Sequence, residues 1–322
     1  MLTFYHRVGD RLTQTVVHGP SDLPVSATVW IDMLEPTPAE EAQVERLLAI
    51  DVPTREEMQE IEESSRLYAE GNALFMTMPV VNKAATEPES AAVTFILAQT
   101  AAVTLRYVDP QPFGMFARRI LRSPELATSP EQALIGLLEQ VTDRLADILQ
   151  GAAAEIDAIS ADIFRKPAGA ARVHGGLQEI LQRVGRAGDL ATKARESLLG
   201  LSRLLLFLST QPACSKEGKE HIETLMRDVH SLADHDSFLA DKIAFLQDAT
   251  LGMIDIEQSN IIKLFTVAAV AFMPPTLVAS IYGMNFKHMP ELDWPFGYPL
   301  ALLLMALSAV LPFVFFRRKG WL

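Results

Sequence analysis

The sequence is short of cysteine and of positive charge. Its 322 residues include one cysteine, Cys214, which excludes an internal disulfide and permits a reducing compartment. Lys and Arg number 28 against 40 Asp and Glu, a formal net charge of -12. We expect no nucleic-acid partner, because phosphate binding needs a basic face.

Sequence motifs of enzymes are also missing. There is no G-x-x-x-x-G-K-[ST] phosphate loop, no His-Glu-x-x-His, no pair of cysteine ligands and no G-x-S-x-G elbow. We therefore expect neither an enzyme nor an organic cofactor, and no ATP to supply energy. The first residues, MLTFYHRVGDRLTQ, lack the apolar core of a signal peptide, so the N-terminus is expected to stay cytoplasmic.

Long apolar runs are confined to the C-terminal end. Residues 264–286 and 294–316 are two uncharged runs of 23 residues, separated by the seven residues KHMPELD. As a helix each would be about 35 Å long, enough to cross a hydrocarbon core of about 30 Å. The sequence therefore predicts a membrane hairpin and a lipid bilayer as partner.

The flanking charges predict the orientation of this hairpin. Arg317, Arg318 and Lys319 follow the second run, whereas the short loop carries only Lys287. Because basic residues remain cytoplasmic, both termini are expected inside a bacterial inner membrane, with the loop in the periplasm. Residues 1–260, which carry a net charge of -15, are then cytoplasmic as well.

The cytoplasmic part reads as an α+β domain of α/β layers followed by long helices. Residues 26–31, 73–81, 92–98 and 101–108 are predicted strands, the last two joined by a tight turn at Gln99-Thr100. Capping boxes at Thr37, Thr54 and Ser129 predict three helix starts. No proline occurs between Pro212 and Pro274, which leaves room for one helix of about 90 Å.

The predicted organisation is a cytoplasmic α/β domain at 1–127, an antiparallel pair of long helices at 128–212, a stalk helix at 213–286 whose end (264–286) is the first span, a periplasmic loop at 287–293, a second span at 294–316 and a basic tail at 317–322.

Two clusters of polar residues can be explained as solvent-exposed helix surfaces. His230 and His235 are five residues apart, about 140° around a helix, which is poor for sharing a metal and favours a solvated face. Residues 35–63 hold ten carboxylates and two arginines. These are either exposed faces of two amphipathic helices or a surface that concentrates divalent cations.

One row of the first span is small or weakly polar. Steps of three and four back from the loop give Gly283, Ser280, Thr276, Met273, Ala269, Thr266, Ile262 and Ser259. Such a row suits helix–helix contact and also suits a wet pore, so the row alone leaves both readings open.

The segment that ends this row resembles the CorA family of magnesium transport proteins. The resemblance rests on Gly283-Met284-Asn285 after Tyr282, on PPTLVAS at 274–280, on MPEL at 289–292, on Trp294 with Gly297-Tyr298-Pro299, on the ending RKGWL, and on IEQ at 256–258. The string WID at 30–32 is a further, less specific match.

The resemblance implies a funnel-shaped homopentamer whose first spans line a central pore. Gly283, Met284 and Asn285 would form the selectivity filter, and the row from Ser259 to Ser280 would line the pore. Neutral Asn285 oxygens could bind the water shell of Mg²⁺, which dehydrates reluctantly. Glu291 and Asp293 would attract cations to the periplasmic mouth, and Met273 with Ile262 could form an apolar constriction.

The resemblance also implies feedback by cytoplasmic Mg²⁺, so that Mg²⁺ is both the transported and the regulatory ion. Asp228 and Asp248 are the candidate regulatory ligands, although each also reads as a plain exposed acid. A divalent cation moving inward gains about 4.6 kcal/mol per 100 mV, so passive uptake is expected.

Other functions remain open at this point. Co²⁺ and Ni²⁺ are possible further ions. A Zn²⁺ transporter of the same superfamily is the nearest alternative, and a membrane-anchored sensor or scaffold is an alternative of a different class. An anchor would leave the weakly polar row and Asn285 unexplained.

Overall fold

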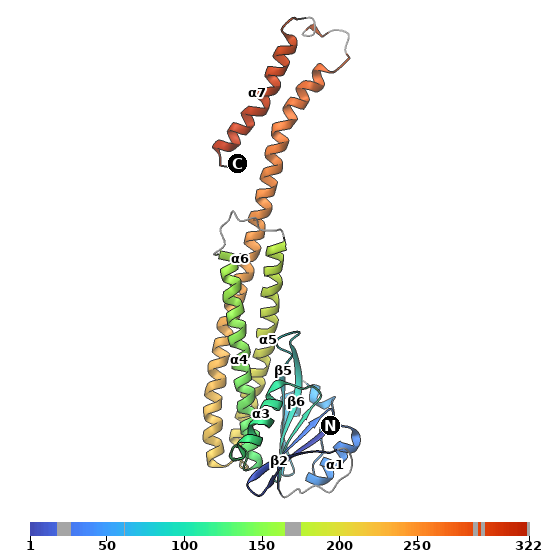
Figure 1. Cartoon of the computed structure of the whole chain (residues 1–322), viewed down its shortest axis with the longest axis vertical. Helices are drawn as coiled ribbons and strands as arrows, with labels where there is room; N and C mark the ends of the chain where they lie inside the picture. The colour runs from blue at the N-terminus through green and yellow to red at the C-terminus, as the bar shows by residue number, and fades with distance from the viewer. Residues whose placement is uncertain (18–26, 61, 165–174, 286–288, 291–293, 321–322) are drawn as a thin grey trace. The chain divides into compact units, whose positions relative to one another are not determined.

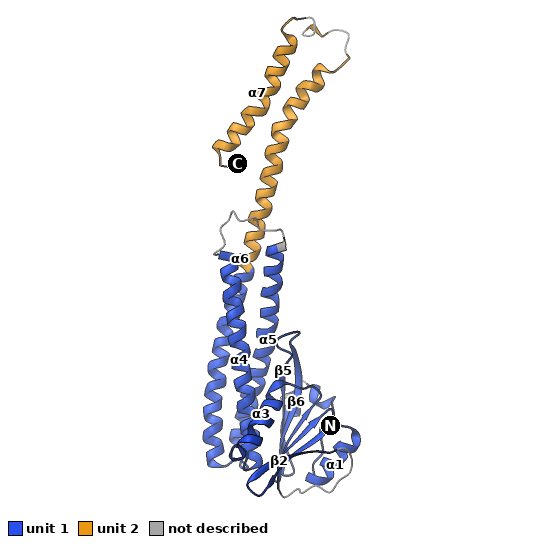
Figure 2. Ribbon diagram, viewed as in Figure 1, with its two compact units in different colours: residues 1–247 blue, residues 248–322 orange. Residues whose placement is uncertain are grey.

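The computed structural model describes residues 1–17, 27–60, 62–164, 175–285, 289–290 and 294–320. The chain divides into two compact units, residues 1–247 and residues 248–322 (Figure 2). The elements of the first unit are β1 (Leu2–Val8), β2 (Arg11–Val17), β3 (Thr28–Leu34), α1 (Pro38–Leu48), η2 (Glu57–Gln59), α2 (Glu63–Arg66), β4 (Leu67–Glu70), β5 (Ala73–Asn82), β6 (Glu89–Leu97), β7 (Ala102–Arg106), α3 (Gln111–Arg122), η3 (Pro124–Leu126), α4 (Pro130–Phe164) and α5 (Gly175–Thr210). Helix α6 (Lys216–Tyr282) begins in the first unit and ends in the second, which also contains α7 (Gly297–Arg318).

The strands form one seven-stranded sheet in the order β2-β1-β3-β7-β6-β5-β4. Only the central pair, β3 and β7, is parallel; the other described neighbours are antiparallel. Helices α3, α4 and α5 lie against one face of the sheet, and α1 lies on the other (Figure 1). This arrangement is the expected α+β fold of α/β layers followed by long helices.

The strand predictions over 73–81, 92–98 and 101–108 fall on β5, β6 and β7. The turn at Gln99-Thr100 is closed by the hydrogen bond from the Ala98 amide to the Ala101 carbonyl, 3.1 Å long. The N-terminal hairpin of β1 and β2 was not predicted, although Leu2 and Phe4 are fully buried. Strand β3 continues to Leu34, three residues beyond the predicted end at Ile31.

Two capping boxes from the sequence are formed, with different results. At Thr37 the hydroxyl accepts from the Glu40 amide and the Glu40 carboxylate accepts from the Thr37 amide, and α1 follows for eleven residues. At Thr54 the same bonds to Glu57 form, but only a three-residue turn follows. The prediction of a helix after Thr54 was therefore wrong. The η2 turn buries only Met58, and a longer helix would need a packed apolar face to be stable.

A charged pair lies inside the sheet, between its two parallel strands. The Arg106 guanidinium donates to both Asp32 oxygens, at 3.0 and 2.8 Å, and both side chains are about 5% exposed. The Thr104 hydroxyl donates to Asp32 at 2.7 Å and accepts from the Trp30 indole at 3.0 Å. The string WID at 30–32 therefore serves the sheet, since its Asp32 is held by strand β7.

Candidate functional site

The N-terminus of α6 is fixed by a glutamate from α4. The Glu131 Oε1 accepts hydrogen bonds from the Ser215 amide at 2.8 Å and the Ser215 hydroxyl at 3.1 Å. The Ser215 Oγ in turn accepts from the Gly218 amide at 3.0 Å, which makes Ser215 the N-cap. A Cβ at Gly218 would collide with the Glu131 Oε1, so glycine is needed for this approach.

In the first unit α6 packs along one regular row. Its buried positions recur at steps of three, four and seven, which is the pattern of a helix that winds around its neighbours. They are Ile222, Leu225, Val229, Asp236, Leu239, Ile243 and Leu246. The opposite side holds Phe238 and Phe245, each 60% exposed. Phe245 stacks on Phe164 of α4, with ring centres 6.1 Å apart, and both phenylalanines still leave most of their apolar surface exposed in one chain.

Two charged links hold α6 to the helix pair. The Arg195 Nε of α5 donates to the Asp236 Oδ2 at 2.7 Å, and the Asp236 side chain is 1% exposed. Lys242 pairs with Asp157 of α4. The Asp236 Oδ1 is buried without a hydrogen-bond partner among the described residues, so the bond from Arg195 to Oδ2 is what offsets the burial of this carboxylate.

Asp228 lies on the exposed side of α6 and is electrostatically coupled to α4. Partial burial raises the pKa of Asp143, and the carboxylates of Glu139, Asp147 and Asp228 raise it further against the opposing charge of Arg119. Asp228 is thus near other acids of the same chain. Asp248, the first residue of the second unit, is exposed.

No metal-binding group is assembled within the described part of one chain. It contains no set of three His, Cys, Asp or Glu side chains placed to hold an ion. His230 pairs instead with Asp234 at 3.7 Å, both strongly exposed, in agreement with a solvated face.

The acidic stretch at 35–63 is used partly for structure. The Glu40 carboxylate accepts from the N-terminal ammonium and from Thr37; burial alone would raise its pKa, but these bonds outweigh burial and lower it. Glu41 accepts from the Tyr107 hydroxyl at 3.3 Å, and the Arg55 guanidinium lies 5.0 Å from the Tyr107 ring centre. These acids stabilise the surface around α1. Glu62 is exposed, and the side chain of Glu63 lies outside the described residues.

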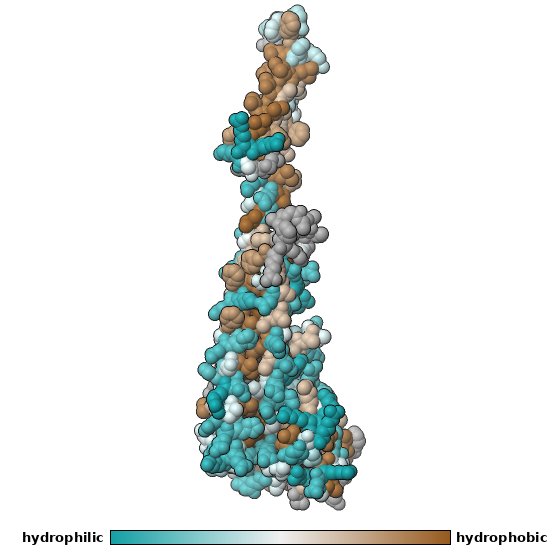
Figure 3. Space-filling model, turned by 60° about the vertical axis from the view of Figure 1, so that its left-hand side comes forward, coloured by the Kyte–Doolittle hydropathy of each residue, from teal (hydrophilic) through white to brown (hydrophobic). Residues whose placement is uncertain are grey.

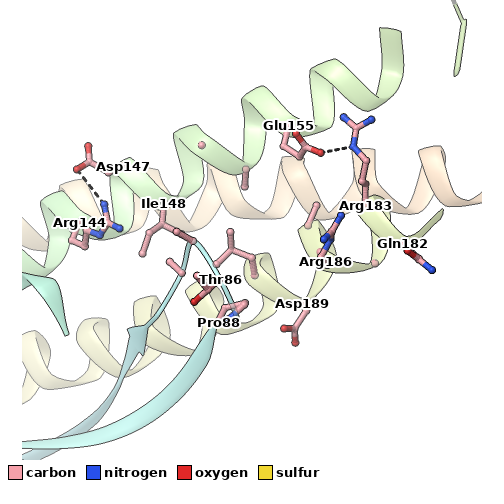
Figure 4. A pocket seen from close by; sticks show the side chains of 17 residues that line it. Thr86, Pro88, Arg144, Asp147, Ile148, Glu155, Gln182, Arg183, Arg186 and Asp189 are labelled. Atoms are coloured by element: carbon pink, nitrogen blue, oxygen red, sulfur yellow. Dashed lines mark hydrogen bonds and ion pairs between the residues drawn. The ribbon is translucent and has the colours of Figure 1, made fainter. Parts of the chain in front are cut away.

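A cavity of about 810 Å³ opens between α4, α5 and the turn from β5 to β6 (Figure 4). Its rim alternates arginines with carboxylates: the Arg183 Nε donates to Glu155 at 2.7 Å, and Arg144 lies 4.0 Å from Asp147. Because these charges cancel locally, the cavity favours neither cations nor anions.

Helices α6 and α7 are the two in the described chain that are long and apolar enough to cross a membrane. Only 6% of the apolar window of α6 and 11% of that of α7 is buried. A core helix of a soluble protein would be mostly buried, so these windows are surfaces for lipid or for other copies. Figure 3 shows the apolar surface gathered on these helices.

The predicted row lies on α6 as a line of exposed side chains. Ser259, Ile262, Thr266, Ala269, Met273, Thr276 and Ser280 are all exposed. Neighbouring apolar residues such as Phe265 and Phe272 are equally exposed, at 70% and 73%. Exposure in one chain is therefore not specific to the row, although Val267 of the same segment is buried. The small or weakly polar side chains of the row are what distinguish it.

The two threonines of the row donate their hydroxyl protons to the backbone of their own helix. The Thr266 hydroxyl donates to the Ile262 carbonyl and the Thr276 hydroxyl to the Phe272 carbonyl, both at 2.8 Å. Their oxygen lone pairs are left free to accept hydrogen bonds from water. The row can thus offer neutral acceptors to a hydrated cation, without any charge that would hold it.

The helix ends at the tripeptide singled out from the sequence. The Gly283 amide donates to Ala279 at 2.9 Å and the Met284 amide to Ile281 at 3.2 Å, which closes the last turn. A Cβ at Gly283 would lie 3.1 Å from the Ala279 carbonyl oxygen, so a side chain there is crowded. Asn285 follows outside the helix and is exposed. Glu291 and Asp293 lie outside the described residues.

Comparison with known proteins covers the whole of this arrangement. The family model described as CorA-like Mg²⁺ transporter protein matches residues 25–318. The magnesium transport protein CorA of Wolinella succinogenes is 32% identical over 302 residues, 92% of each chain. The protein of the same name from Escherichia coli (strain K12) is 32% identical over 323 residues, the full length of both chains.

Solved structures share the fold at lower identity. The CorA magnesium transporter of Methanocaldococcus jannaschii has a TM-score of 0.75 at 19% identity, covering 100% of this chain and 98% of that one. The ZntB cytoplasmic domain of Vibrio parahaemolyticus has a TM-score of 0.58 at 12% identity, covering 79% of this chain and 97% of that domain. The match of the family model runs from the sheet through the tripeptide to the end of α7, and full-length relatives share a third of their residues with this chain, which therefore belongs to the family of CorA-like Mg²⁺ transporter proteins.

Proposed function

We propose that the protein is a Mg²⁺ uptake channel of a bacterial inner membrane, in which α6 lines the ion path. The observation that carries this proposal is the row of neutral, exposed side chains on α6 that ends at Gly283-Met284-Asn285. Membership of a Mg²⁺ transporter family supports Mg²⁺ as the transported ion, and the row supports α6 as the lining of its path.

The filter that we propose is a ring of Asn285 amides from several copies. A neutral amide oxygen accepts hydrogen bonds from the waters of a hydrated Mg²⁺, whereas a carboxylate ring would slow its exit. Gly283 suits this role, because a residue without a side chain would let the backbones of neighbouring copies approach one another closely. Met284 completes the filter, and Glu291 and Asp293 would concentrate cations at the mouth.

Assembly around α6 is required, because one helix cannot enclose a path. Phe238 and Phe245 of α6 support this, since each remains 60% exposed in one chain, Phe245 even while stacked on Phe164. We propose a funnel-shaped homopentamer with α7 outside α6. Within it, Ile262 and Met273, which are 57% and 69% exposed, would form the apolar constriction.

The closed state would be stabilised by cytoplasmic Mg²⁺ bound between copies. One described chain has no metal-binding group, so ligands such as Asp228 and Asp248 would need a neighbour to complete a site. The closed form must then bind Mg²⁺ more tightly than the open form. The pKa of Asp143 is raised first by burial and then by the nearby acids Glu139, Asp147 and Asp228, and a cation bound beside these acids would relieve their repulsion.

The topology that we propose places residues 1–260 and the tail 317–322 in the cytoplasm and the loop 287–293 in the periplasm. Transport would be passive and driven by the membrane potential, which gives a divalent cation about 4.6 kcal/mol per 100 mV. Co²⁺ and Ni²⁺ could follow the same path. Transport of Zn²⁺ is a second candidate, favoured only by the shared fold with the ZntB domain.

Ion flux into liposomes that contain the purified protein tests this function. Wild type should admit Mg²⁺ under an inside-negative potential, and Asn285→Ala should lose selectivity or flux. Asn72→Ala, at an exposed turn of the first unit, is the matched control and should behave as wild type. Zn²⁺ flux in place of Mg²⁺ flux would favour the alternative ion, and no flux of any divalent cation would leave a membrane-anchored scaffold.

A further inference from the structure

Four cations gather at one end of the membrane hairpin. Arg317 and Arg318 end α7, Lys319 follows, and Lys263 lies on α6. The chain reverses direction between α6 and α7 (Figure 1), so depths can be counted from the connecting loop. Lys263 lies roughly 29 Å from Tyr282 along α6 and Arg317 roughly 30 Å from Gly297 along α7, at 1.5 Å per residue. We call these four side chains the basic end of the hairpin.

The basic end has no negative partner in the described chain. Lys263 is half-buried, the other three are exposed, and none of the four forms an ion pair with a described carboxylate. Among the described residues, the Lys319 ammonium lies 5.4 Å from the centre of the Phe315 ring. The first unit behaves differently, since Arg106, Arg183 and Arg195 each bind a carboxylate there.

The neighbouring surface identifies the missing anion. Phe313, Val314 and Phe315 are 42–55% exposed and lie directly before the cations on α7. A free phosphate would meet only the cations, whereas a phospholipid would also cover this apolar surface with its acyl chains. Successive residues of a helix point about 100° apart, so Arg317 and Arg318 present two guanidinium groups over a broad arc. A guanidinium binds a phosphate through two parallel hydrogen bonds.

We propose that the basic end of the hairpin binds an anionic phospholipid of the cytoplasmic leaflet, with its phosphate on Arg317, Arg318 and Lys319 and its acyl chains along α7. This inference rests on the proposed insertion of the hairpin in the membrane. The proposal goes beyond the orientation of the hairpin by its charges. Orientation needs only positive charge near the span, whereas headgroup binding makes the stability of the bound state depend on which lipid is supplied.

The test compares lipid binding to the purified full-length chain by native mass spectrometry. Dioleoylphosphatidylglycerol and dioleoylphosphatidylcholine are offered at equal concentrations, and their dissociation constants are compared. Wild type should prefer phosphatidylglycerol, and R317Q/R318Q/K319Q should reduce this preference about fivefold for each cation removed. R11Q/R118Q/R186Q, three exposed arginines of the first unit without ion pairs among the described residues, should keep the wild-type preference.

Three results would overturn the proposal: equal binding of both lipids by wild type, an unchanged preference in the triple variant, or displacement of phosphatidylglycerol by inorganic phosphate at the same concentration. If the triple variant does not fold, Arg317→Gln alone should still show the loss for one cation. Because binding is read without flux, loss of Mg²⁺ flux with intact lipid preference would reject the proposed function and leave this inference standing.

Discussion

The two units of the chain use charge in opposite ways. In residues 1–247 the cations Arg106 and Arg195 are bound to carboxylates that are almost fully buried. In the described part of residues 248–322, Lys263, Arg317, Arg318 and Lys319 form no ion pair with a described carboxylate, and most apolar side chains of α6 and α7 are exposed. The buried carboxylates Asp32 and Asp236 of the first unit have cationic partners within the chain, whereas the proposed function has the second unit surrounded by lipid, water and other copies.

The largest effect should come from breaking the pairing of charge in the first unit. Arg106→Met leaves Asp32 ionised and buried without its main partner, and this should cost about 3–5 kcal/mol of unfolding free energy. Urea unfolding of the full chain in detergent measures this change. Arg118→Met removes an exposed arginine and should change stability by less than about 0.5 kcal/mol. Equal stability of the two variants would show that the Asp32–Arg106 pair does not support the sheet.

Two glycine-to-alanine substitutions, one in each unit, compare how tightly the helices of the two units are packed. A Cβ at Gly200 would lie 2.8 Å from the Pro79 Cδ, so Gly200→Ala should cost about 1–3 kcal/mol by forcing α5 away from β5. A Cβ at Gly252, in the second unit, meets nothing within 4 Å. Gly252→Ala should therefore stabilise α6 by up to about 1 kcal/mol, which is the difference in helix propensity. Thermal unfolding compares the two, and changes of the same sign would contradict this account.

The smallest expected effect is a change in the free energy of unfolding with pH. The pKa of Asp143 is raised by partial burial and then by Glu139, so the native state binds this proton more tightly than the unfolded chain does. The stability that Asp143 contributes is therefore present at low pH and is lost as the pH rises through its folded-state pKa. Asp143→Asn should stabilise the protein at pH 7 by less than about 1 kcal/mol, and the gain should vanish below the unfolded-state pKa. Urea unfolding between pH 3 and pH 8 tests this, and a gain that is constant with pH would contradict it.

Local signals in the sequence located most of the elements. The strand at residues 73–81, the turn at Gln99-Thr100 and the helix after Thr37 all depend on nearby residues, and β5, the β6–β7 turn and α1 are found there. The long proline-free interval lies in α6 from Lys216 onward, and the helix continues through Pro274 and Pro275 to Tyr282. At Thr54 the local signal was present and the helix was not, because capping bonds alone do not replace a packed face.

Features that depend on residues far apart in the sequence were not predictable in this way. The Asp32–Arg106 pair joins positions 74 residues apart, and the Glu131 cap of α6 acts across 84 residues. The row on α6 was found from spacing, but its partner surface depends on other copies, which one chain does not contain. For the same reason the roles of Asn285, Asp228 and Asp248 remain predictions.

Cysteine accessibility is the most direct test of the claim that the weakly polar row of α6 faces the ion path. In a Cys214→Ala background, Thr276→Cys and Leu277→Cys place a thiol on adjacent exposed positions about 100° apart, one on the row and one beside it. A charged thiosulfonate reagent should block Mg²⁺ flux through Thr276→Cys and leave flux through Leu277→Cys intact. Block of Leu277→Cys with no effect on Thr276→Cys, or equal block of both, would contradict the assignment of this row to the path.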